Sequence, residues 1–453
     1  MQKFSLTSNT VLLIYFTSLS PVAFAAGFYN DLQSTSLMGN AFAGAGAAGD
    51  DASVMFYNPA SLMLFDEGQV VFSGIYAAID SEFTVDSAHD SAGDLEPAAT
   101  GQQYSALPDQ FSPAIYAAAP LGDDFVLGMS LTSPYEVESD YSDTLVDNTA
   151  RQTQFISYTG NLSLAMEVTE QLSLGVGANL QYFKAKVNAN LHGSEVISGD
   201  PGPTTIIALS EYQGDDIAFY PNFGLLYEFT EDTRIGLNYR MHVDHDTEGD
   251  FFVDFEVIQP DGSIQLGSLN SPGNSLIKLP DMASINLFHE PFERVELLFD
   301  VMFTRWSRFQ DLTVTVDEVF ENESQPVNTT LNFKDAWRVG VGANYYLSDE
   351  IKLRSGFSFD ESPVTDETRT LQGPDSNQIS VAVGMMYKPK AWERTHLDFA
   401  YMHTFFQDGT VSQINPLVGI PFPAPIIIPD TLTATGTFNT SADFLGVQLV
   451  RVM

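Results

Sequence analysis

About fourteen stretches that alternate apolar and polar side chains follow Ser61, and short and long connections separate them in turn. Successive side chains of a β-strand point to opposite faces, so period-2 alternation indicates strands. We expect strands to begin near Gln69, Phe111, Phe125, Thr153, Leu172, Ile217, Arg234, Ser275, Val295, Asp335, Ile351, Ser376, Thr395 and Thr437. This ordered series of strands is the feature that most limits the fold.

The lengths of the connections narrow the choice further. Residues 121–124, 168–171 and 347–350 make short joins, as do the sixth–seventh, eighth–ninth and twelfth–thirteenth joins. The other connections are long: residues 80–110, 133–152, 188–216, 245–274, 307–334, 360–375 and 405–436. Barrels of the outer membrane have short periplasmic turns and long extracellular loops, whereas soluble sandwiches and propellers do not separate loop lengths by parity. The sequence predicts an all-β fold, a transmembrane antiparallel β-barrel of about 14 strands.

The two faces of the predicted strands differ in polarity. In residues 295–306, Leu297 and Phe299 share one face, whereas Glu296 and Asp300 share the other. A barrel with lipid outside and water inside requires this arrangement, because backbone polar groups in lipid must pair within a closed sheet. The apolar face is therefore expected to contact the bilayer.

The first 25 residues are typical of a secretory signal peptide. Lys3 supplies a positive charge, residues 11–19 form a short apolar core, and Ala23-Phe24-Ala25 is a small-x-small cleavage site. We expect the mature chain to start at Ala26. The apolar core is shorter than the roughly 20 residues of a spanning helix, and we expect no transmembrane helix in the rest of the chain.

Composition excludes several classes of protein. The chain has 453 residues and a formal net charge of −40, so we expect repulsion from nucleic acid. It has no Cys, which excludes a disulfide framework and thiolate metal sites. Its 12% of aromatic residues is too high for a disordered acidic chain.

Residues 26–61 lack strand alternation and are rich in Gly and Ala, including Gly39, and end near Asn58-Pro59-Ala60. Small residues pack closely against walls, and Asn-Pro is a turn signal. The alternatives are a compact plug and a flexible arm. A barrel of this width would leak if empty, which favours the plug. The predicted division is signal peptide 1–25, hatch 26–61 and barrel 62–453.

Ordered motifs give a resemblance to a known family. They are Ala26-Gly27-Phe28, Gly39-Asn40-Ala41-Phe42-Ala43-Gly44, Asp50-Asp51-Ala52-Ser53, Asn58-Pro59-Ala60, Leu279-Pro280-Asp281-Met282, Trp306-Ser307-Arg308-Phe309, Phe333-Lys334-Asp335-Ala336-Trp337-Arg338, Phe359-Asp360-Glu361-Ser362-Pro363-Val364, Pro374-Asp375 and Tyr401-Met402-His403. Together they resemble the FadL-type long-chain fatty acid outer-membrane transporters, a family that includes aromatic-hydrocarbon channels.

The resemblance implies a fourteen-stranded barrel with a hatch and passive uptake of hydrophobic compounds, long-chain fatty acids first and aromatic or alkane hydrocarbons as the alternative. It implies capture among extracellular loops, passage to a pocket near the hatch, and sideways release through a gap beside a kinked strand. One departure is the C-terminal Met453, since such barrels usually end in an aromatic residue that the barrel assembly machinery reads.

Three basic residues are candidate contacts for a fatty acid head group, because a lumenal cation could form a charge-assisted hydrogen bond with a carboxylate. Lys334 and Arg338 have the inward parity of the tenth strand, although pairing with lumenal carboxylates is the alternative role. Lys184 matches a basic position that the family uses near the ligand. Its parity counted from Leu172 is lipid-facing, which would place it at the outer rim against lipopolysaccharide.

Two further regions are candidates. Phe422 and Ile427 lie in the apolar loop of residues 421–429, and exposed apolar loops often mark binding surfaces, although packing against neighbouring loops is the alternative. Ser133 and Pro134 follow the third strand, at the family's gap, where Pro removes a ladder donor. A plain strand terminator explains them as well.

Enzymatic and adhesive roles are the other classes considered. An outer-membrane lipid hydrolase is the alternative of a different class, but no Ser lies in a recognisable nucleophile context. A purely adhesive barrel would not need a hatch. We expect no catalytic residue, no cofactor and no metal site in a monomer that contacts outer-membrane lipid and lipopolysaccharide.

Overall fold

The computed structural model describes residues 27–88, 98–142, 144–146, 151–195, 204–320, 323–414, 418–421, 425–428 and 433–453. The predicted signal peptide lies outside the described residues. In the described part of the chain, no helix is long and apolar enough to cross a membrane.

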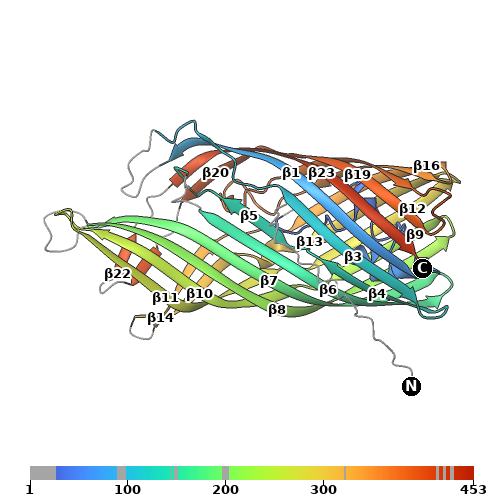
Figure 1. Cartoon of the computed structure of the whole chain (residues 1–453), viewed down its shortest axis with the longest axis horizontal. Coiled ribbons are helices and arrows are strands. Elements are labelled where there is room, and N and C mark those ends of the chain that lie inside the picture. Colours follow the sequence, from blue (N-terminus) through green and yellow to red (C-terminus); the bar gives the residue numbers. More distant parts are fainter. Residues whose placement is uncertain are drawn as a thin grey trace, which may run out of the picture.

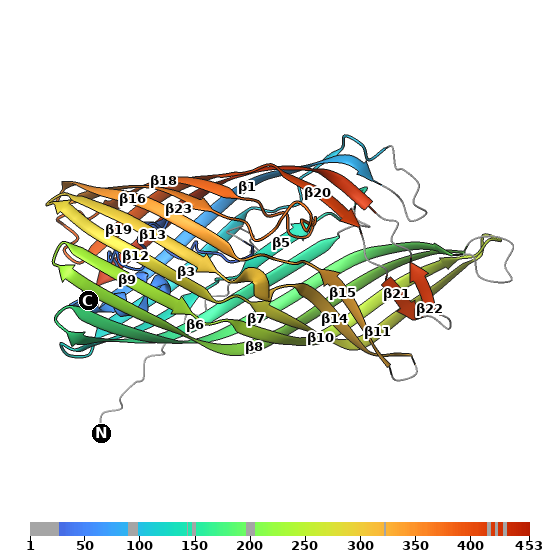
Figure 2. The same cartoon turned by 180° about the vertical axis from the view of Figure 1, so that it is seen from behind.

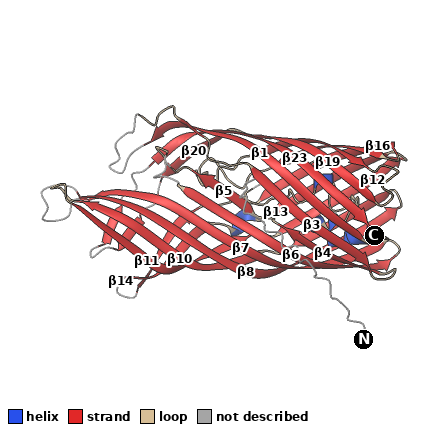
Figure 3. Cartoon of the chain, in the orientation of Figure 1, coloured by secondary structure: helices blue, strands red, loops and turns tan. Residues whose placement is uncertain are grey.

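The described elements are mostly strands, with few and short helices (Figures 1 and 3). The helices are α1 Thr35–Met38, α2 Val54–Tyr57, and the 3-10 helices η1 Pro59–Leu64 and η2 Trp306–Arg308. The strands are β1 Gln69–Ala88, β2 Gln103–Tyr104, β3 Gln110–Pro120, β4 Phe125–Thr132, β5 Glu136–Asp140, β6 Gln152–Thr169, β7 Leu172–Glu195, β8 Thr204–Thr230, β9 Thr233–Arg240, β10 Val243–Ile258, β11 Ile264–Leu279, β12 Met282–Phe292, β13 Val295–Thr304, β14 Asp311–Phe320, β15 Glu323–Thr330, β16 Ala336–Ser348, β17 Ile351–Asp360, β18 Gln378–Tyr387, β19 Thr395–Phe406, β20 Gly409–Ile414, β21 Val418–Pro421, β22 Pro425–Ile428 and β23 Thr433–Val452.

The strands form a closed antiparallel barrel of 14 strands, as the sequence predicts. Closure occurs at β1, which pairs with β3 on one side and with β23 on the other. Several barrel strands consist of two consecutive elements. For example, β9 and β10 both pair with β8, and β11 and β12 continue each other beside them.

The predicted long connections are less irregular than expected. The sequence predicts long loops at residues 188–216, 245–274 and 307–334, but much of each belongs to β7, β8, β10, β11, β14 and β15. Of these strands, β7, β8, β10 and β11 extend farthest beyond the rest of the barrel (Figures 1 and 2). Cross-strand pairing satisfies the backbone groups of these extensions. Period-2 alternation of side chains alone does not predict such pairing.

The outer face of the barrel is apolar and the inner face is largely polar. On β13, Leu297 and Phe299 are exposed on the outside, whereas Glu296 and Asp300 are buried inside. On β16, Val339 and Val341 are outside and Arg338 is inside. The alternation predicted from the sequence therefore separates a bilayer-facing surface from a lumen.

The described part of the predicted hatch, residues 27–61, is here called the hatch and packs inside the barrel near the end where short turns join the strands (Figure 3). Wall glycines allow this close packing. A Cβ on Gly356 of β17 would lie 2.0 Å from the Asn40 backbone, and one on Gly175 of β7 would lie 2.3 Å from the Ala60 nitrogen. These two wall positions admit no side chain, because the hatch backbone occupies the space.

Candidate functional site

Cationic side chains of the wall bind the hatch. Arg234 donates from Nε to the Ala47 carbonyl and from Nη2 to the Ala48 carbonyl, both at 2.7 Å. Lys352 and Arg354 on β17 both form ion pairs with Asp50 of the hatch. In a chain with only 19 Lys and Arg, these contacts concentrate positive charge around the hatch.

The predicted turn at Asn58-Pro59-Ala60 begins the helix η1. The Asn58 Oδ1 accepts a hydrogen bond from the Ala60 N–H at 3.1 Å, and Pro59 is the first residue of η1. Pro is suited to this position because its missing N–H has no partner there. The Asn58 Nδ2 also donates to the Leu225 carbonyl of the wall at 3.1 Å.

Gly39 lies where the hatch packs closely against β17 and β18 of the barrel wall. It follows α1, and a Cβ there would lie 3.1 Å from the Gly384 Cα of β18 and 3.2 Å from the Arg354 Cδ. Its gating role, like that of Asn58, Pro59 and Ala60, stays a prediction.

A break in strand pairing occurs beside Ser133 and Pro134. Together β4 and β5 form the third barrel strand, which is interrupted between them. Of the β3 residues, only Ile115 to Pro120 pair with β4. In the described part of the chain, β5 pairs with β6 alone, while Gln110 to Ala114 of β3 pair with β1 alone. We call this unpaired stretch of wall, between residues 110–114 and 133–140, the wall gap.

The start of the hatch bonds to both edges of the wall gap. At the edge near β5, the Asn30 N–H donates to the Pro134 carbonyl at 2.7 Å, and the Glu136 N–H donates to the Phe28 carbonyl at 3.0 Å. At the β3 edge, the Asn30 Nδ2 donates to the Ser112 Oγ at 3.0 Å. At the edge near β5, residues 28–30 of the hatch thus satisfy backbone groups that an adjacent strand would otherwise pair, whereas the contact at the β3 edge joins two side chains.

Gln33 adds a further connection between the hatch, the Ser133 edge of the gap, and β3 just beyond the gap. Its Nε2 donates to the Ser133 carbonyl at 2.9 Å, and its Oε1 accepts from the Ser133 N–H at 3.1 Å. The Tyr116 hydroxyl of β3 donates to the Gln33 carbonyl at 2.8 Å. One hatch residue therefore bonds to the Ser133 edge of the gap and to the neighbouring paired part of β3.

A mostly apolar pocket lies on the loop side of the hatch, and we call it the loop-side cavity. Its walls come from the hatch, from barrel strands and from the connection between β17 and β18; among the lining residues are Phe28, Phe155, Phe309, Leu312, Leu331, Phe333 and Val364. Among its described lining residues, only Asp375 has an ionisable side chain. The cavity suits a largely apolar ligand.

Asp375 lines this cavity and also hydrogen-bonds to Gly27, the first described residue of the hatch. Its Oδ2 accepts from the Gly27 N–H and from the Ser362 hydroxyl, both at 2.8 Å. Burial raises the pKa of the Asp375 carboxyl to about 6, and hydrogen bonds from Gly27, Ser362, Gln378 and Ser376 oppose that rise. The carboxyl therefore changes charge in a mildly acidic range.

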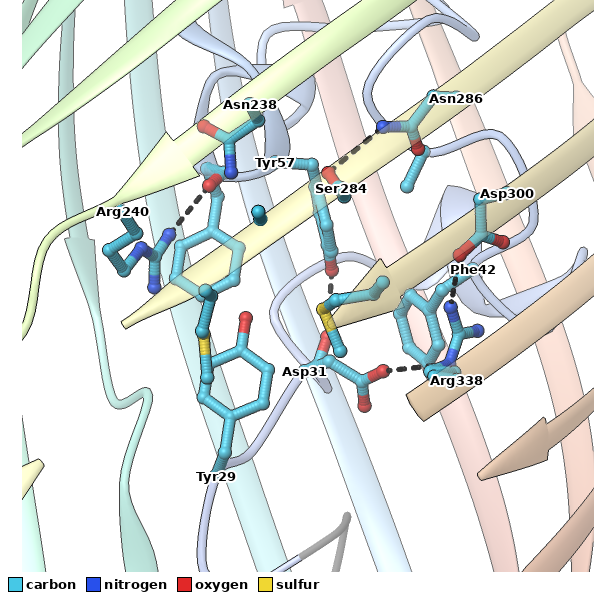
Figure 4. Close-up of a pocket in the computed structure, with 15 residues that line it drawn as sticks. Tyr29, Asp31, Phe42, Tyr57, Asn238, Arg240, Ser284, Asn286, Asp300 and Arg338 are labelled. Atoms are coloured by element: carbon cyan, nitrogen blue, oxygen red, sulfur yellow. Dashed lines mark hydrogen bonds and ion pairs between the residues drawn. The ribbon is translucent and has the colours of Figure 1, made fainter. Parts of the chain in front are cut away.

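A second pocket lies between the hatch and the barrel wall (Figure 4), and we call it the hatch-side cavity. Hatch residues Tyr29, Asp31 and Phe42 line it together with residues of β9, β12, β13 and β16. Figure 4 shows Arg240 on one side and Arg338 with Asp300 on the other. The consecutive residues Phe28 and Tyr29 contribute to the loop-side and hatch-side cavities respectively.

In the structure, Arg338 contacts carboxylates and a carbonyl of the protein, whereas the sequence suggested a fatty acid head group as its partner. Arg338 is inside the barrel, as its parity indicates, with Nη1 2.8 Å from Asp300 and Nε 3.7 Å from Asp31. Its Nη2 donates to the Ala41 carbonyl of the hatch. The alternative role that the sequence left open, pairing with lumenal carboxylates, describes this arrangement.

Strand parity does not set the direction of the Lys334 side chain, and its contact with a fatty acid head group stays a prediction. Residues 331–335 precede β16, so strand parity does not extend to this side chain. Lys334 is exposed, and its Nζ lies 2.9 Å from Glu361. Its neighbours Leu331 and Phe333 line the loop-side cavity instead.

Lys184 lies on β7 opposite Asp215 of β8, on the face away from the buried Phe183. This outward position agrees with the parity count and places the side chain away from both cavities. Phe422 lies outside the described residues, as does the side chain of Ile427 in β22. A binding role for the loop of residues 421–429 therefore stays a prediction.

Several site residues were missed from the sequence, among them Arg234, Arg240, Lys352 and Arg354. The signal was present: Arg234 and Arg240 alternate with Ile235, Leu237 and Tyr239 in β9, so both have inward parity. Lys352 and Arg354 flank the outward Leu353 of β17 in the same way. Asp375 had no such signal, because it lies in a connection without strand periodicity.

Residues 16–448 match the model of a protein family described as outer membrane protein transport protein (OMPP1/FadL/TodX). The long-chain fatty acid transport protein of Salmonella typhi is 26% identical over 420 residues, which are 89% of this chain and 93% of that protein. Outer membrane protein P1 of Haemophilus influenzae is 29% identical over 410 residues, 83% of this chain and 86% of that protein.

Solved structures share the fold. A Pseudomonas aeruginosa FadL homologue superposes with a TM-score of 0.80 at 20% identity, covering 94% of this chain and 99% of the other. The toluene transporter TodX of Pseudomonas putida superposes with a TM-score of 0.66 at 16% identity, covering 89% and 94% of the two chains. This chain therefore has the same barrel fold as both proteins.

Proposed function

This chain belongs to the outer membrane protein transport protein family (OMPP1/FadL/TodX), and from that premise we propose that it imports long-chain fatty acids and releases them sideways through the wall gap. The observation that carries the proposal is a hatch whose first residues border the apolar loop-side cavity and also bond to both edges of the gap. One movement of this segment would connect cavity and membrane.

Capture in the loop-side cavity follows from the side chains that line it. Phe28 packs among Trp306, Phe309 and Phe155, with ring centroids 4.9, 5.3 and 5.6 Å away. An apolar ligand entering the cavity competes for these same surfaces, because apolar contacts are non-directional. Displacement of Phe28 would draw the adjacent backbone away from Glu136 at the gap.

Sideways release avoids a step that is unfavourable for a hydrophobic substrate. A route straight through the lumen would expose the substrate to the polar groups that join the hatch to the wall, such as Asp50 with Lys352. The wall gap opens instead toward the bilayer, where apolar surface is already out of water. Short-turn and long-loop ends are assigned to the periplasm and the exterior on the same proposal.

A long-chain fatty acid is the proposed substrate because relatives across most of the chain are named long-chain fatty acid transport proteins. Aromatic or alkane hydrocarbons are the second candidate. The observation in their favour is the loop-side cavity, whose described lining residues include no Lys or Arg. Uptake of labelled oleate and toluene by cells with and without the protein tests both, and we expect faster oleate uptake with the protein.

A cross-link across the wall gap tests sideways release. The chain contains no Cys, so Asn30→Cys with Ser112→Cys introduces a single possible pair, whose parent atoms lie 3.0 Å apart. We expect oxidation to hold the hatch on the β3 edge and stop oleate uptake, and reduction to restore it.

The matched control is a cross-link within the wall. Ser81 and Thr440 are directly paired residues of β1 and β23, with hydroxyl oxygens 2.8 Å apart. The oxidised Ser81→Cys, Thr440→Cys variant should import oleate at the rate of its reduced form. Undiminished uptake by the fully cross-linked Asn30, Ser112 variant would refute release through the gap.

A further inference from the structure

Arg240 is the last residue of β9, and its side chain is buried against the hatch, with an exposed fraction of 4%. Its guanidinium carbon lies 4.2 Å from the centre of the Phe56 ring, and its Nη2 donates to the Phe56 carbonyl at 2.7 Å. The side chain lines the hatch-side cavity (Figure 4). It is therefore a buried cation held in a fixed orientation at a cavity surface.

The guanidinium of Arg240 has an unused donor. Its Nη1 is buried and, among the described residues, has no hydrogen-bond acceptor. Nor does any described carboxylate lie within ion-pair distance of Arg240. A buried cation without a counter-ion is costly, since burial removes its hydration, and an anionic ligand would relieve that cost.

The other wall cations around the hatch differ from Arg240. Arg338 pairs with Asp300 and Asp31, Arg354 with Asp398 and Asp50, and Lys352 with Asp50 and Glu296. Arg234, like Arg240, contacts hatch carbonyls, but it uses both Nε and Nη2 for them. In the described structure, Arg240 combines a missing counter-ion with a free donor at a cavity.

We propose that Arg240 binds the carboxylate of a long-chain fatty acid in the hatch-side cavity, as a second binding position after the loop-side cavity. This inference rests on the proposed function and names the group that recognises the acid. A planar guanidinium presents donors that match a carboxylate, and such charge-assisted bonds are strong when water is excluded.

The distribution of charge within the cavity supports this position. Asp300 and Asp31 lie on the side of Arg338, away from Arg240 (Figure 4). Phe56, Tyr29 and Met282 supply apolar surface on the Arg240 side. A carboxylate at Arg240 is thus separated from the acidic side chains, and its acyl chain has apolar neighbours.

The two cavities are adjacent along the hatch. Phe28 lines the loop-side cavity and Tyr29 lines the hatch-side cavity, and both rings pack on Tyr135 next to the wall gap. A ligand that displaces this pair of residues reaches Arg240 from the loop-side cavity. Hydrocarbons lack the carboxylate, so Arg240 would select acids over neutral compounds of the same length.

The test compares oleate with methyl oleate, which has the same acyl chain without the charge. Dissociation constants for both are measured on the purified full-length protein and on its Arg240→Gln variant. We expect Arg240→Gln to weaken oleate binding at least about tenfold, as for loss of a hydrogen bond to a charged group, and to change methyl oleate binding less than about twofold. An Arg240→Lys variant should keep part of the preference for the acid, and it replaces Arg240→Gln if that variant does not fold.

Arg234→Gln is the matched control, because it removes another arginine of β9 that donates to hatch carbonyls. It should leave the ratio of the two dissociation constants unchanged. If Arg240→Gln alters both ligands equally, or neither, Arg240 only holds the hatch and the proposal is overturned. Wild-type protein that binds neither ligand would overturn the proposed function itself, and with it this inference.

Discussion

At the residue scale, Asp50 is the hatch carboxylate that two buried wall cations, Lys352 and Arg354, share. Asp50→Asn should destabilise the protein by about 2 kcal/mol, below the usual cost of breaking a buried pair, because Lys352 keeps Glu296 and Arg354 keeps Asp398. Thermal unfolding and single-channel conductance in planar bilayers measure this, and we expect brief openings to become more frequent.

The control for Asp50 is Glu67→Gln, which breaks the exposed Arg394–Glu67 pair at 2.9 Å. An exposed pair contributes little, so its loss should change stability by no more than about 1 kcal/mol and leave conductance unaltered. Equal effects of the two substitutions would contradict the role assigned to Asp50.

Also at the residue scale, we expect the titration of Asp375 to make the stability of the start of the hatch depend on pH. Burial raises its pKa to about 6, so the folded state holds the proton more tightly than the unfolded chain does. Its contribution to stability is complete below about pH 4, falls as pH rises, and is lost above about pH 6. Hydrogen exchange at residues 27–33 should therefore be faster at pH 7.5 than at pH 5, after correction for intrinsic exchange rates.

An Asp375→Asn variant isolates this contribution from that of other acids. It keeps a polar side chain at the Gly27 N–H without the charge, so the corrected exchange should vary less with pH than in the wild type. A variant with the same pH dependence as the wild type would show that other groups cause it.

At the scale of elements, the close approach of β17 to the hatch predicts the effect of a wall substitution. A Cβ at Gly356 would lie 2.0 Å from the Asn40 backbone, so Gly356→Val should displace the hatch and raise conductance. Gly160→Val on β6 is the control, since a Cβ there meets nothing within 4 Å. A Gly356→Val channel as closed as that of Gly160→Val would show that the hatch adapts to the wall.

At the scale of the whole molecule, we expect the interior of a barrel of 14 strands to conduct unless the hatch fills it. Deleting residues 27–61 behind an intact signal should leave a barrel that assembles, with a large and steady ion conductance and without selective uptake. A deletion variant that stays electrically closed would show that the loops seal the pore.

Pro59→Gly should be milder than the deletion. It loosens the first turn of η1 but leaves the Asn58 contacts to Ala60 and Leu225 available. We expect intermittent openings in planar bilayers, separated by closed periods, and permanent opening would contradict a local effect.

The strand pattern was accessible from sequence because bilayer and lumen impose opposite polarities on alternate residues, as Phe299 and Asp300 illustrate. The same parity identified the inward side of Arg338 and would have identified Arg240. It does not apply to Lys334, which precedes its strand, and it gave no information on residues 188–216, where pairing between β7 and β8 continues beyond the expected loop boundary.

The amino-acid sequence is enough to predict the barrel, the number of its strands and a compact segment before them, because each follows from local alternation, connection length or composition. Which side chains contact one another can be read only from the folded chain. Asp375 and Gly27 are 348 residues apart in the chain, and Asn30 and Ser112 are 82 apart. Whether a buried cation such as Arg240 or Arg338 has a counter-ion depends on where distant strands place their carboxylates, and no local pattern contains that information.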